Sequence, residues 1–286
     1  MVAKLIKGTG GFYIVKTEDG ELFTLRPRGK LRFLTQTPTV GDMVNMTPGA
    51  EGTHGWLEEI LPRRNLMIRP PVSNIDIVAL TVAAVPARDL LLIDKLILNA
   101  RAADIGCVLV CNKIDIDCGY VDSVKKEYGE SGVPVFPVSA LIQESLSDLK
   151  KAIQGKATCF AGQSGVGKSA LISALTGRTF ETGAISERTE RGRHTTRHVE
   201  LIAQDDMLIL DTPGFSLLDA CEVPSAELAD YYPEFDGLTE NCRFQPCMHD
   251  TEPDCAVRAR HGGGGRYARY VQLLREYKEL ERGRYK

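Results

Sequence analysis

A phosphate-loop signature constrains the fold of this 286-residue chain more than any other feature. It reads Gly162-Gln163-Ser164-Gly165-Val166-Gly167-Lys168-Ser169 and fits the pattern of Gly, four residues, Gly-Lys-Ser. An apolar run before it is typical of a buried strand, and a run of helical period begins at Ala170. We expect the N–H groups of residues 162–170 to bind phosphate, Lys168 to act on the β- and γ-phosphates, and Ser169 to hold Mg²⁺. The alternative is a Gly-rich turn that only joins two elements.

Two motifs nearer the N-terminus indicate which base is bound. Asn112-Lys113-Ile114-Asp115 follows an apolar strand pattern, at the strand end where open α/β sheets bind ligands. The Asp115 carboxylate can accept from guanine N1–H and N2–H₂ together, a donor pair that adenine lacks. We expect Asn112 to bond the other edge of the base and the Lys113 stem to cover its face. A further strand ends in Ser139-Ala140, whose N–H groups are expected to meet guanine O6.

The motifs that contact the γ-phosphate follow the phosphate loop. A predicted strand over 207–210 ends in Asp211-Thr212-Pro213-Gly214. We expect Asp211 to hold Mg²⁺ through water and the Gly214 N–H to meet the γ-phosphate. The segment 192–197 supplies hydroxyl groups, and we assign Thr196 to Mg²⁺, with Thr195 as the close rival. Together these motifs predict a GTPase domain.

The order of the motifs is unusual. The two guanine motifs precede the phosphate loop, whereas they come last in an ordinary GTPase, so the sequence predicts a circularly permuted domain. Phe215 follows Gly214 where many GTPases place the Gln that orients the attacking water, and an apolar side chain cannot do this. Catalysis then needs His194 of the switch segment or a group from a partner. A plain surface role for His194 stays open.

A second constellation lies near the C-terminus. Cys242, Cys247, His249 and Cys255 form a complete tetrahedral ligand set for Zn²⁺ with no open position, which favours one structural zinc ion. The surrounding stretch has little apolar content and could hardly fold without a metal. Buried thiols without metal are the alternative. The closed ligand set also argues against a zinc-dependent metabolic enzyme. The other four cysteines before position 200 and Cys221 lack such grouping.

Short strand patterns separated by Gly and Pro occupy the first 70 residues and predict an all-β barrel of the OB type, a frequent binder of single-stranded nucleic acid. We therefore expect three parts: this barrel over 1–70, an α/β phosphate-loop GTPase domain over 71–218, and a small zinc-binding helical domain over 219–286. The last domain should end in a helix over 267–282 with one apolar face.

Charge is distributed unevenly around the net value of −3. Residues 71–255 carry 16 Lys and Arg against 28 Asp and Glu, whereas residues 256–286 carry nine against three. Basic ends around an acidic middle suggest contact with a polyanion. In the N-terminal part, Arg26, Arg28, Lys30 and Arg32 form a basic cluster, for which a solvated loop is the competing interpretation.

No apolar stretch is long enough to span a membrane, and the first residues lack the apolar core of a signal peptide. We expect a cytosolic protein whose cysteines are thiols or metal ligands. Nothing in the sequence suggests a dimer seam, so we expect a monomer.

These motifs, in this order and together with the Cys/His set, resemble the RsgA (YjeQ) family of circularly permuted GTPases with an N-terminal OB domain and a C-terminal zinc domain. Segments 28–32 and 69–76 also resemble family stretches. The resemblance implies binding to the small ribosomal subunit and its rRNA during late maturation, and GTP hydrolysis to GDP and phosphate stimulated by that subunit. It also implies that His194 is the catalytic histidine. The alternative is a GTP-dependent switch for a non-ribosomal protein partner, with the basic ends incidental.

Overall fold

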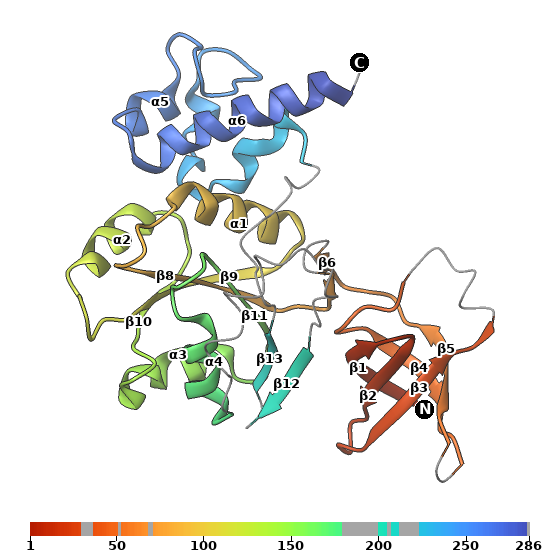
Figure 1. Cartoon of the computed structure of the whole chain (residues 1–286). Helices are drawn as coiled ribbons and strands as arrows, with labels where there is room; N and C mark the ends of the chain where they lie inside the picture. The colour runs from red at the N-terminus through yellow and green to blue at the C-terminus, as the bar shows by residue number, and fades with distance from the viewer. Residues whose placement is uncertain are drawn as a thin grey trace.

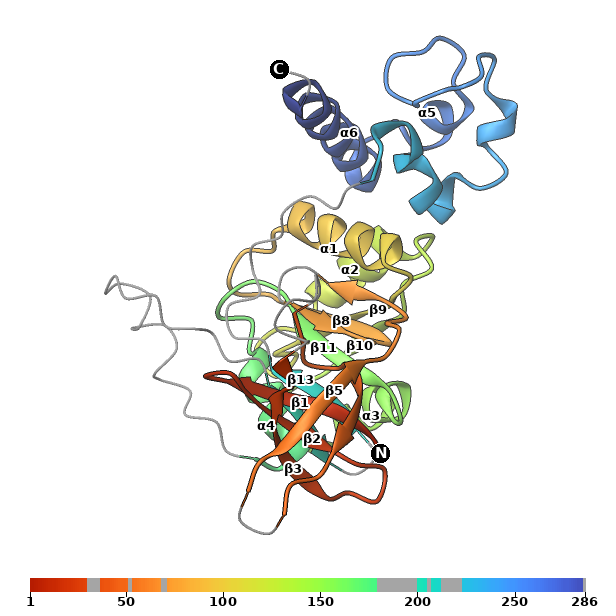
Figure 2. The same cartoon turned by 90° about the vertical axis from the view of Figure 1, so that its right-hand side faces the viewer.

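The computed structural model describes residues 1–29, 37–50, 53–67, 71–178, 200–204, 207–211 and 223–284, without the side chains of residues 200, 203, 204, 211 and 284. The chain forms a barrel, a central α/β domain and a C-terminal part that we define as residues 223–284. The central domain lies between the other two (Figures 1 and 2). Among the helices of the described ranges, none is long and apolar enough to cross a bilayer.

Five antiparallel and parallel strand pairings close the N-terminal barrel. Its strands are β1 (Val2–Thr9), β2 (Phe12–Lys16), β3 (Leu22–Pro27), β4 (Met43–Thr47) and β5 (Gly55–Ile60). They are ordered β1-β2-β3-β5-β4, and β4 pairs back onto β1. Leu5, Val15, Leu25 and Leu57 are fully buried inside, as the alternation of a half-buried strand requires. The predicted OB-type barrel is confirmed.

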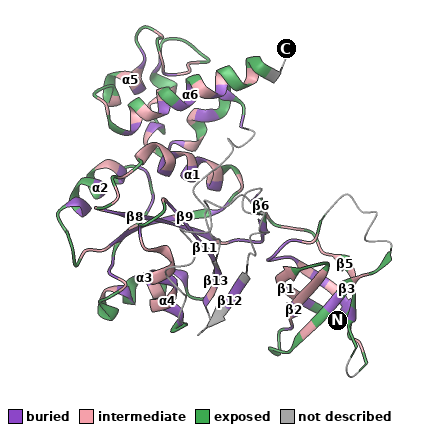
Figure 3. Cartoon of the chain, in the orientation of Figure 1, coloured by how far each residue is buried: buried purple, intermediate pink, exposed green. Residues whose placement is uncertain are grey.

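The central domain is built on five parallel strands with one antiparallel strand beside them. In spatial order they are β10 (Val135–Pro137), β9 (Gly106–Asn112), β8 (Ile77–Ala83), β11 (Ala157–Ala161), β13 (Met207–Asp211) and the antiparallel β12 (Glu200–Gln204). All seven residues of β8 are buried, which Figure 3 shows as purple ribbon. A continuous apolar run is what a strand covered on both faces needs.

Helices cover both faces of this sheet. On one face lie α1 (Leu90–Ala102) and α2 (Tyr120–Tyr128), whose apolar side chains pack with Val78 and Leu80 of β8. On the other lie the 3₁₀ turn η2 (Gln143–Leu146), α3 (Ser147–Ile153) and α4 (Lys168–Thr176), which pack with Ile77 and Ala79. The phosphate-loop GTPase architecture predicted for this domain is confirmed.

The barrel joins the central domain through its sheet and through a local polar cluster. Strand β1 pairs with β12 at Lys7 and Glu200, so one sheet runs through both domains. The cluster, which we call the barrel joint, lies next to the short hairpin β6 (Leu66–Met67) and β7 (Val72–Ser73). Arg63 donates from Nε and Nη2 to the two carboxylate oxygens of Asp42 at 2.7 and 2.8 Å. The Ser73 hydroxyl donates to the same carboxylate at 2.6 Å, and the Thr39 N–H at 2.7 Å.

The C-terminal part contains the 3₁₀ turns η4 (Ser225–Tyr231), η5 (Pro233–Phe235) and η6 (Thr239–Asn241), then α5 (Ala256–His261) and α6 (Gly265–Arg284). The predicted terminal helix is confirmed as α6, and it packs against α1 and α2. Tyr232, Phe235, Tyr270 and Leu273 form the centre of a small core that also takes in Leu98 of α1.

Buried charges hold α6 to the central domain in what we call the C-terminal junction. The Asp94 carboxylate of α1 is completely buried and accepts from Arg266 Nε at 3.1 Å and from Arg269 Nε. Arg266 also pairs with Glu234 at 2.5 Å, and Arg269 with Glu127 of α2 at 2.8 Å. Burial raises the pKa of Asp94, and the two guanidinium groups oppose that rise.

Candidate nucleotide and zinc sites

The phosphate loop connects β11 to α4 and is packed tightly against neighbouring strand ends. A Cβ atom at Gly162, where φ is 138°, would lie 2.2 Å from the carbonyl oxygen of Thr81. A Cβ atom at Gly167 would lie 2.4 Å from Asn112 Nδ2. Only glycine fits at either position. The loop residues Ser164 and Gly165 are exposed, and α4 begins directly after the loop, so its N-terminal end lies where helices bind anions.

The Lys168 side chain lies across the phosphate loop, where it is predicted to contact the β- and γ-phosphates. Its Nζ donates to the carbonyl oxygens of Gly162 and Gln163, both at 2.7 Å. The ammonium group is therefore held over the concave side of the loop, where the anion of a phosphate would accept from it. Ser169 and Ala170 follow in the first turn of α4, half-buried beside it.

Asn112 and Lys113 connect the base-reading loop to the phosphate loop. Lys113 Nζ donates to the carbonyl oxygens of Gly165 at 2.6 Å and Val85 at 3.1 Å. Asn112 is buried, and its Nδ2 donates to the Val166 carbonyl at 2.9 Å while its Oδ1 accepts from the Ala140 N–H at 3.3 Å. The Asn112 amide thus braces two loops in this structure, and its contact with the base edge stays a prediction.

Asp115 is exposed at the mouth of the same loop, with one oxygen fixed. The hydroxyl of the buried Ser139 donates to Asp115 Oδ1 at 2.5 Å. Ser139 itself is held by Ser145, whose Oγ accepts from the Ser139 N–H at 2.9 Å. These contacts orient the carboxylate towards solvent, where a guanine edge could donate to it.

The structure therefore brings together the predicted residues of three segments, which are the Asn-Lys-x-Asp loop, Ser139-Ala140 and the phosphate loop. Asp211 ends β13, the parallel neighbour of β11, so its backbone lies beside the strand that leads into that loop. Its side chain is not among those described, and Thr195, Thr196, His194, Gly214 and Phe215 lie outside the described residues. Lys30, Arg32 and Cys221 also lie outside them.

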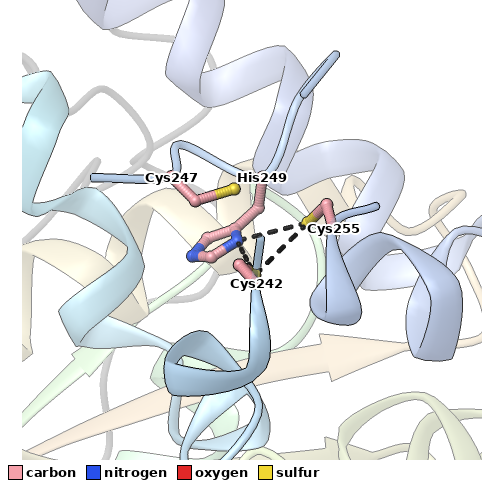
Figure 4. Close-up of side chains that lie close together, drawn as sticks. All are labelled: Cys242, Cys247, His249 and Cys255. Atoms are coloured by element: carbon pink, nitrogen blue, oxygen red, sulfur yellow. Dashed lines mark hydrogen bonds between the residues drawn. The ribbon is translucent and has the colours of Figure 1, made fainter. Parts of the chain in front are cut away.

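The four predicted zinc ligands converge on one point (Figure 4). Cys242 Sγ lies 3.8 Å from Cys255 Sγ and 3.6 Å from His249 Nδ1, and His249 Nδ1 lies 3.4 Å from Cys255 Sγ. A tetrahedral zinc ion with ordinary Zn–S and Zn–N bond lengths separates its ligands by about 3.8 Å for S···S and about 3.6 Å for S···N. The ligand atoms of all four residues lie within 4.8 Å of one another, so the residues present fit a zinc ion.

Two aromatic side chains position the loop that carries Cys247 and His249. The hydroxyl groups of Tyr267 and Tyr270 on α6 donate to the carbonyl oxygens of His249 and Met248, both at 2.8 Å. Burial raises the pKa of the Cys247 thiol to about 12, so a metal ion would have to displace its proton on binding. The zinc site and α6 therefore depend on one another.

Sequence reasoning missed three sets of residues that shape these sites. The C-terminal junction was not predicted, because Arg266 and Arg269 lie 172 and 175 residues from Asp94 and no local pattern links them. Helix α2 was missed because its apolar face is short, and with it the buried hydroxyl of Tyr120. Of the two tyrosines that hold the zinc loop, Tyr270 was predicted only as part of an apolar helix face and Tyr267 only as the first residue of that helix.

Comparison with known proteins identifies the family. The family model for the RsgA GTPase matches residues 60–221, and that for the RsgA N-terminal domain matches residues 4–57. The chain is 41% identical over 292 residues to the small ribosomal subunit biogenesis GTPase RsgA of Caldanaerobacter subterraneus, covering 99% of this chain and 98% of the relative. It is 39% identical over 285 residues to the RsgA of Ruminiclostridium cellulolyticum, covering 96% and 93%.

Two solved structures are similar over nearly the whole chain. The crystal structure of YjeQ from Thermotoga maritima superposes with a TM-score of 0.81 at 31% identity and covers 96% of this chain and 98% of that one. YloQ, described as a circularly permuted GTPase, superposes with a TM-score of 0.78 at 34% identity and covers 98% and 95%. With the permuted motifs on their predicted loops, these matches show that the chain belongs to the RsgA family of GTPases, which hydrolyse GTP.

Proposed function

We propose that this GTPase binds the small ribosomal subunit, assists its late maturation and hydrolyses GTP to GDP and phosphate on the particle. The full-length similarity to proteins named as small ribosomal subunit biogenesis GTPases carries the proposal. The cytosolic location, the monomeric state and the domain limits at 70 and 218 remain predictions alongside it.

Within this proposal, Asp115 reads the guanine edge, while Lys168 and the N–H groups of 162–170 hold the phosphates. Ser169, Thr196 and Asp211 would hold the Mg²⁺ that enters with GTP, and the bound ion would supply electrostatic stabilisation of the charge that develops on the phosphate groups. His194 orients the attacking water, because Phe215 cannot.

Some basic residues are exposed and could contact rRNA, whereas others form ion pairs inside the protein. Arg266 is buried and Arg269 is half-buried in the C-terminal junction, and both pair there with acidic side chains, so they contribute little to an outer surface. Arg260 of α5 and Arg275 of α6 are exposed, and they pair with Glu130 and Asp250 respectively, where water and salt compete for such pairs. These exposed groups are the ones we expect to contact phosphates.

In the barrel, Arg26 and Arg28 point away from the core. The Arg26 guanidinium lies 4.4 Å from the centre of the Phe12 ring, and Arg28 donates to both oxygens of Glu58 at 2.7 Å. A cation beside a partly exposed ring is typical of surfaces on which unpaired bases stack. The barrel therefore supports rRNA binding independently of the C-terminal part.

A GTPase assay with purified small subunits tests the proposal. Because Phe215 replaces the water-orienting Gln, we expect slow hydrolysis by the isolated protein and a salt-sensitive rise of at least about tenfold with subunits. His194→Ala should abolish most of that rise while GTP affinity changes little. His261→Ala, at a histidine far along the chain in α5, is the matched control and should keep the rise.

Equal stimulation of wild type and His194→Ala would remove His194 from catalysis but leave the ribosomal function intact. An absence of stimulation and of co-sedimentation with subunits at any salt concentration would reject the ribosomal function. The alternative, a GTP-dependent switch for a non-ribosomal protein, would then take its place.

A further inference from the structure

Tyr120 connects helix α2 to the strand end from which the base-reading loop departs. It is the first residue of α2, and its side chain is buried. Its hydroxyl donates to the Asn112 carbonyl oxygen at 2.6 Å, with the Val82 carbonyl oxygen 3.4 Å away. Val82 and Asn112 lie at the carboxyl ends of the adjacent parallel strands β8 and β9. The hydroxyl therefore sits where two strands end beneath the nucleotide site.

Asn112 is the residue through which the nucleotide loops contact one another. Its backbone carbonyl accepts from Tyr120, its side-chain amide donates to the phosphate loop at Val166, and its side-chain oxygen accepts from Ala140. A rotation of its backbone would move both side-chain contacts at once, because they extend from the same Cα atom. The position of Asn112 therefore sets how the base loop and the phosphate loop sit together.

The backbone after Asn112 is also constrained. Lys113 has φ of 65°, in the left-handed region that non-glycine residues adopt only at a cost of about 1 kcal/mol or more. This conformation lets Lys113 Nζ reach the Gly165 and Val85 carbonyls and starts the turn that presents Asp115. A conformation of this kind persists only where neighbouring contacts enforce it, and the Tyr120 hydroxyl holds the residue immediately before it.

The surroundings of Tyr120 keep its hydroxyl protonated. Burial raises its pKa above the range of a free phenol, and the nearby Cys111 adds to this effect. The Arg88 guanidinium lies 5.1 Å from the ring centre and favours the phenolate, but burial outweighs it. The O–H group thus remains a donor at neutral pH.

We propose that Tyr120 is a positioning residue of the nucleotide site, which holds the Asn112 carbonyl and so fixes the loop that presents Lys113 and Asp115. The inference rests on the proposed assignment of this loop to the guanine base. Because the base loop serves both nucleotides, losing the hydroxyl weakens GDP and GTP binding by the same factor. The effect falls mainly on KM for GTP, since Tyr120 touches neither the γ-phosphate nor Lys168.

Tyr120→Phe in the full-length, zinc-loaded protein tests this role. The variant deletes one oxygen and leaves the ring packing in place. Loss of one buried hydrogen bond is worth about 1.4 kcal/mol, so we expect Kd for GDP and for GTP each to rise by about tenfold. Fluorescence titration with both nucleotides measures this, and the thermal unfolding temperature of the nucleotide-free protein is recorded in parallel.

Tyr128→Phe is the matched control on the same helix. Tyr128 is equally buried, but its hydroxyl lies 3.4 Å from the Leu90 carbonyl and its ring faces Arg266 of the C-terminal junction. This variant should lower the unfolding temperature like Tyr120→Phe and leave both Kd values unchanged. If both variants weaken nucleotide binding equally, α2 acts only through general stability and the proposal is overturned.

Asp115→Asn separates failure of the inference from failure of the base assignment. An amide at this position should shift the preference from GTP towards xanthosine triphosphate, because it can donate to the xanthine O2. If the preference does not shift, the base assignment is wrong and Tyr120 loses its role with it. If the preference shifts but Tyr120→Phe binds GDP and GTP like wild type, only the role of Tyr120 is rejected.

Discussion

The barrel joint and the C-terminal junction attach two domains to one GTPase core by different means. At the barrel joint, Asp42 keeps four donors from Arg63, Ser73 and Thr39, all within 31 residues of it, and the sheet itself continues from β12 into β1. At the C-terminal junction, Asp94 depends on Arg266 and Arg269, which lie more than 170 residues away.

The Asp42 carboxylate therefore depends on donors that are near in sequence, whereas the Asp94 carboxylate depends on donors that are distant in sequence. The carboxylate of the barrel joint retains donors if one partner is lost, because backbone and hydroxyl groups share its oxygens. The carboxylate of the C-terminal junction relies mainly on two charged groups presented by α6, with the Tyr128 hydroxyl of α2 as a further donor. Helix α6 in turn holds the zinc loop through Tyr267 and Tyr270. We therefore expect the two attachments to fail under different treatments.

Removal of zinc should cause the largest loss of stability, and this loss should be confined to the C-terminal part. Structural zinc contributes on the order of 10 kcal/mol to the folding of small zinc domains. After chelation, we expect the amides of 223–284 to lose hydrogen-exchange protection, because the loop of His249 and helix α6 support one another. The amides of β1–β5 and β8–β11 should keep theirs. Hydrogen exchange followed by mass spectrometry measures both.

Elemental analysis must first show about one zinc per chain in the untreated protein and its loss after chelation. Protection of 223–284 that survives complete zinc loss would mean that the C-terminal part folds by its apolar core alone. Loss of protection in β1–β5 would break the comparison, since the barrel would then depend on the distant zinc site.

Asp94→Ala should be the most damaging single substitution at either attachment. It removes the buried carboxylate that the two guanidinium groups share and leaves Arg266 with Glu234 and Arg269 with Glu127, and breaking a buried ion pair costs about 3–5 kcal/mol. We expect limited proteolysis to cleave before α6 while the central domain resists. Asp122→Ala, at an exposed aspartate of α2, is the control and should change stability by less than about 1 kcal/mol. Equal stability of the two variants would refute a supporting role for the junction.

Arg63→Ala should have a smaller effect, because Asp42 keeps the donors of Ser73 and Thr39. We expect a loss of about 1–3 kcal/mol in denaturant unfolding, confined to the transition that unfolds the barrel. Arg64→Ala removes a largely exposed pair with Asp76 and serves as the neighbouring control, with an expected change of less than about 1 kcal/mol. A larger loss for Arg63→Ala than for Asp94→Ala would reverse the comparison.

The sequence predicted those parts of the fold and site that short motifs specify. A few neighbouring residues are enough to predict the local geometry at Gly162 and Gly167, in the Asn-Lys-x-Asp loop and in the Cys/His set. Their places in the structure follow the prediction. The partners of Asp94 could not be predicted. An aspartate on a predicted helix is expected to be a solvated surface charge, and the sequence does not show that α6 covers it. Likewise, nothing local distinguishes the inward-facing Arg266 and Arg269 from the exposed Arg260 and Arg275. Tyr120 was overlooked because a hydroxyl that holds a backbone carbonyl leaves no sequence pattern.

The distance along the chain between Asp94 and its partners has a consequence for protein synthesis. The ribosome makes residue 94 long before residues 266 and 269, and α6 follows every other element that the structure describes. Until then, the surface of α1 that bears Asp94 and Leu98 is uncovered in the nascent chain. Asp94 is a hydrated charge at that stage and keeps this surface compatible with water beside the apolar Leu98. The Asp94 carboxylate must lose its hydration when α6 covers it in the finished protein. Before that, it would protect the unfinished chain from premature association.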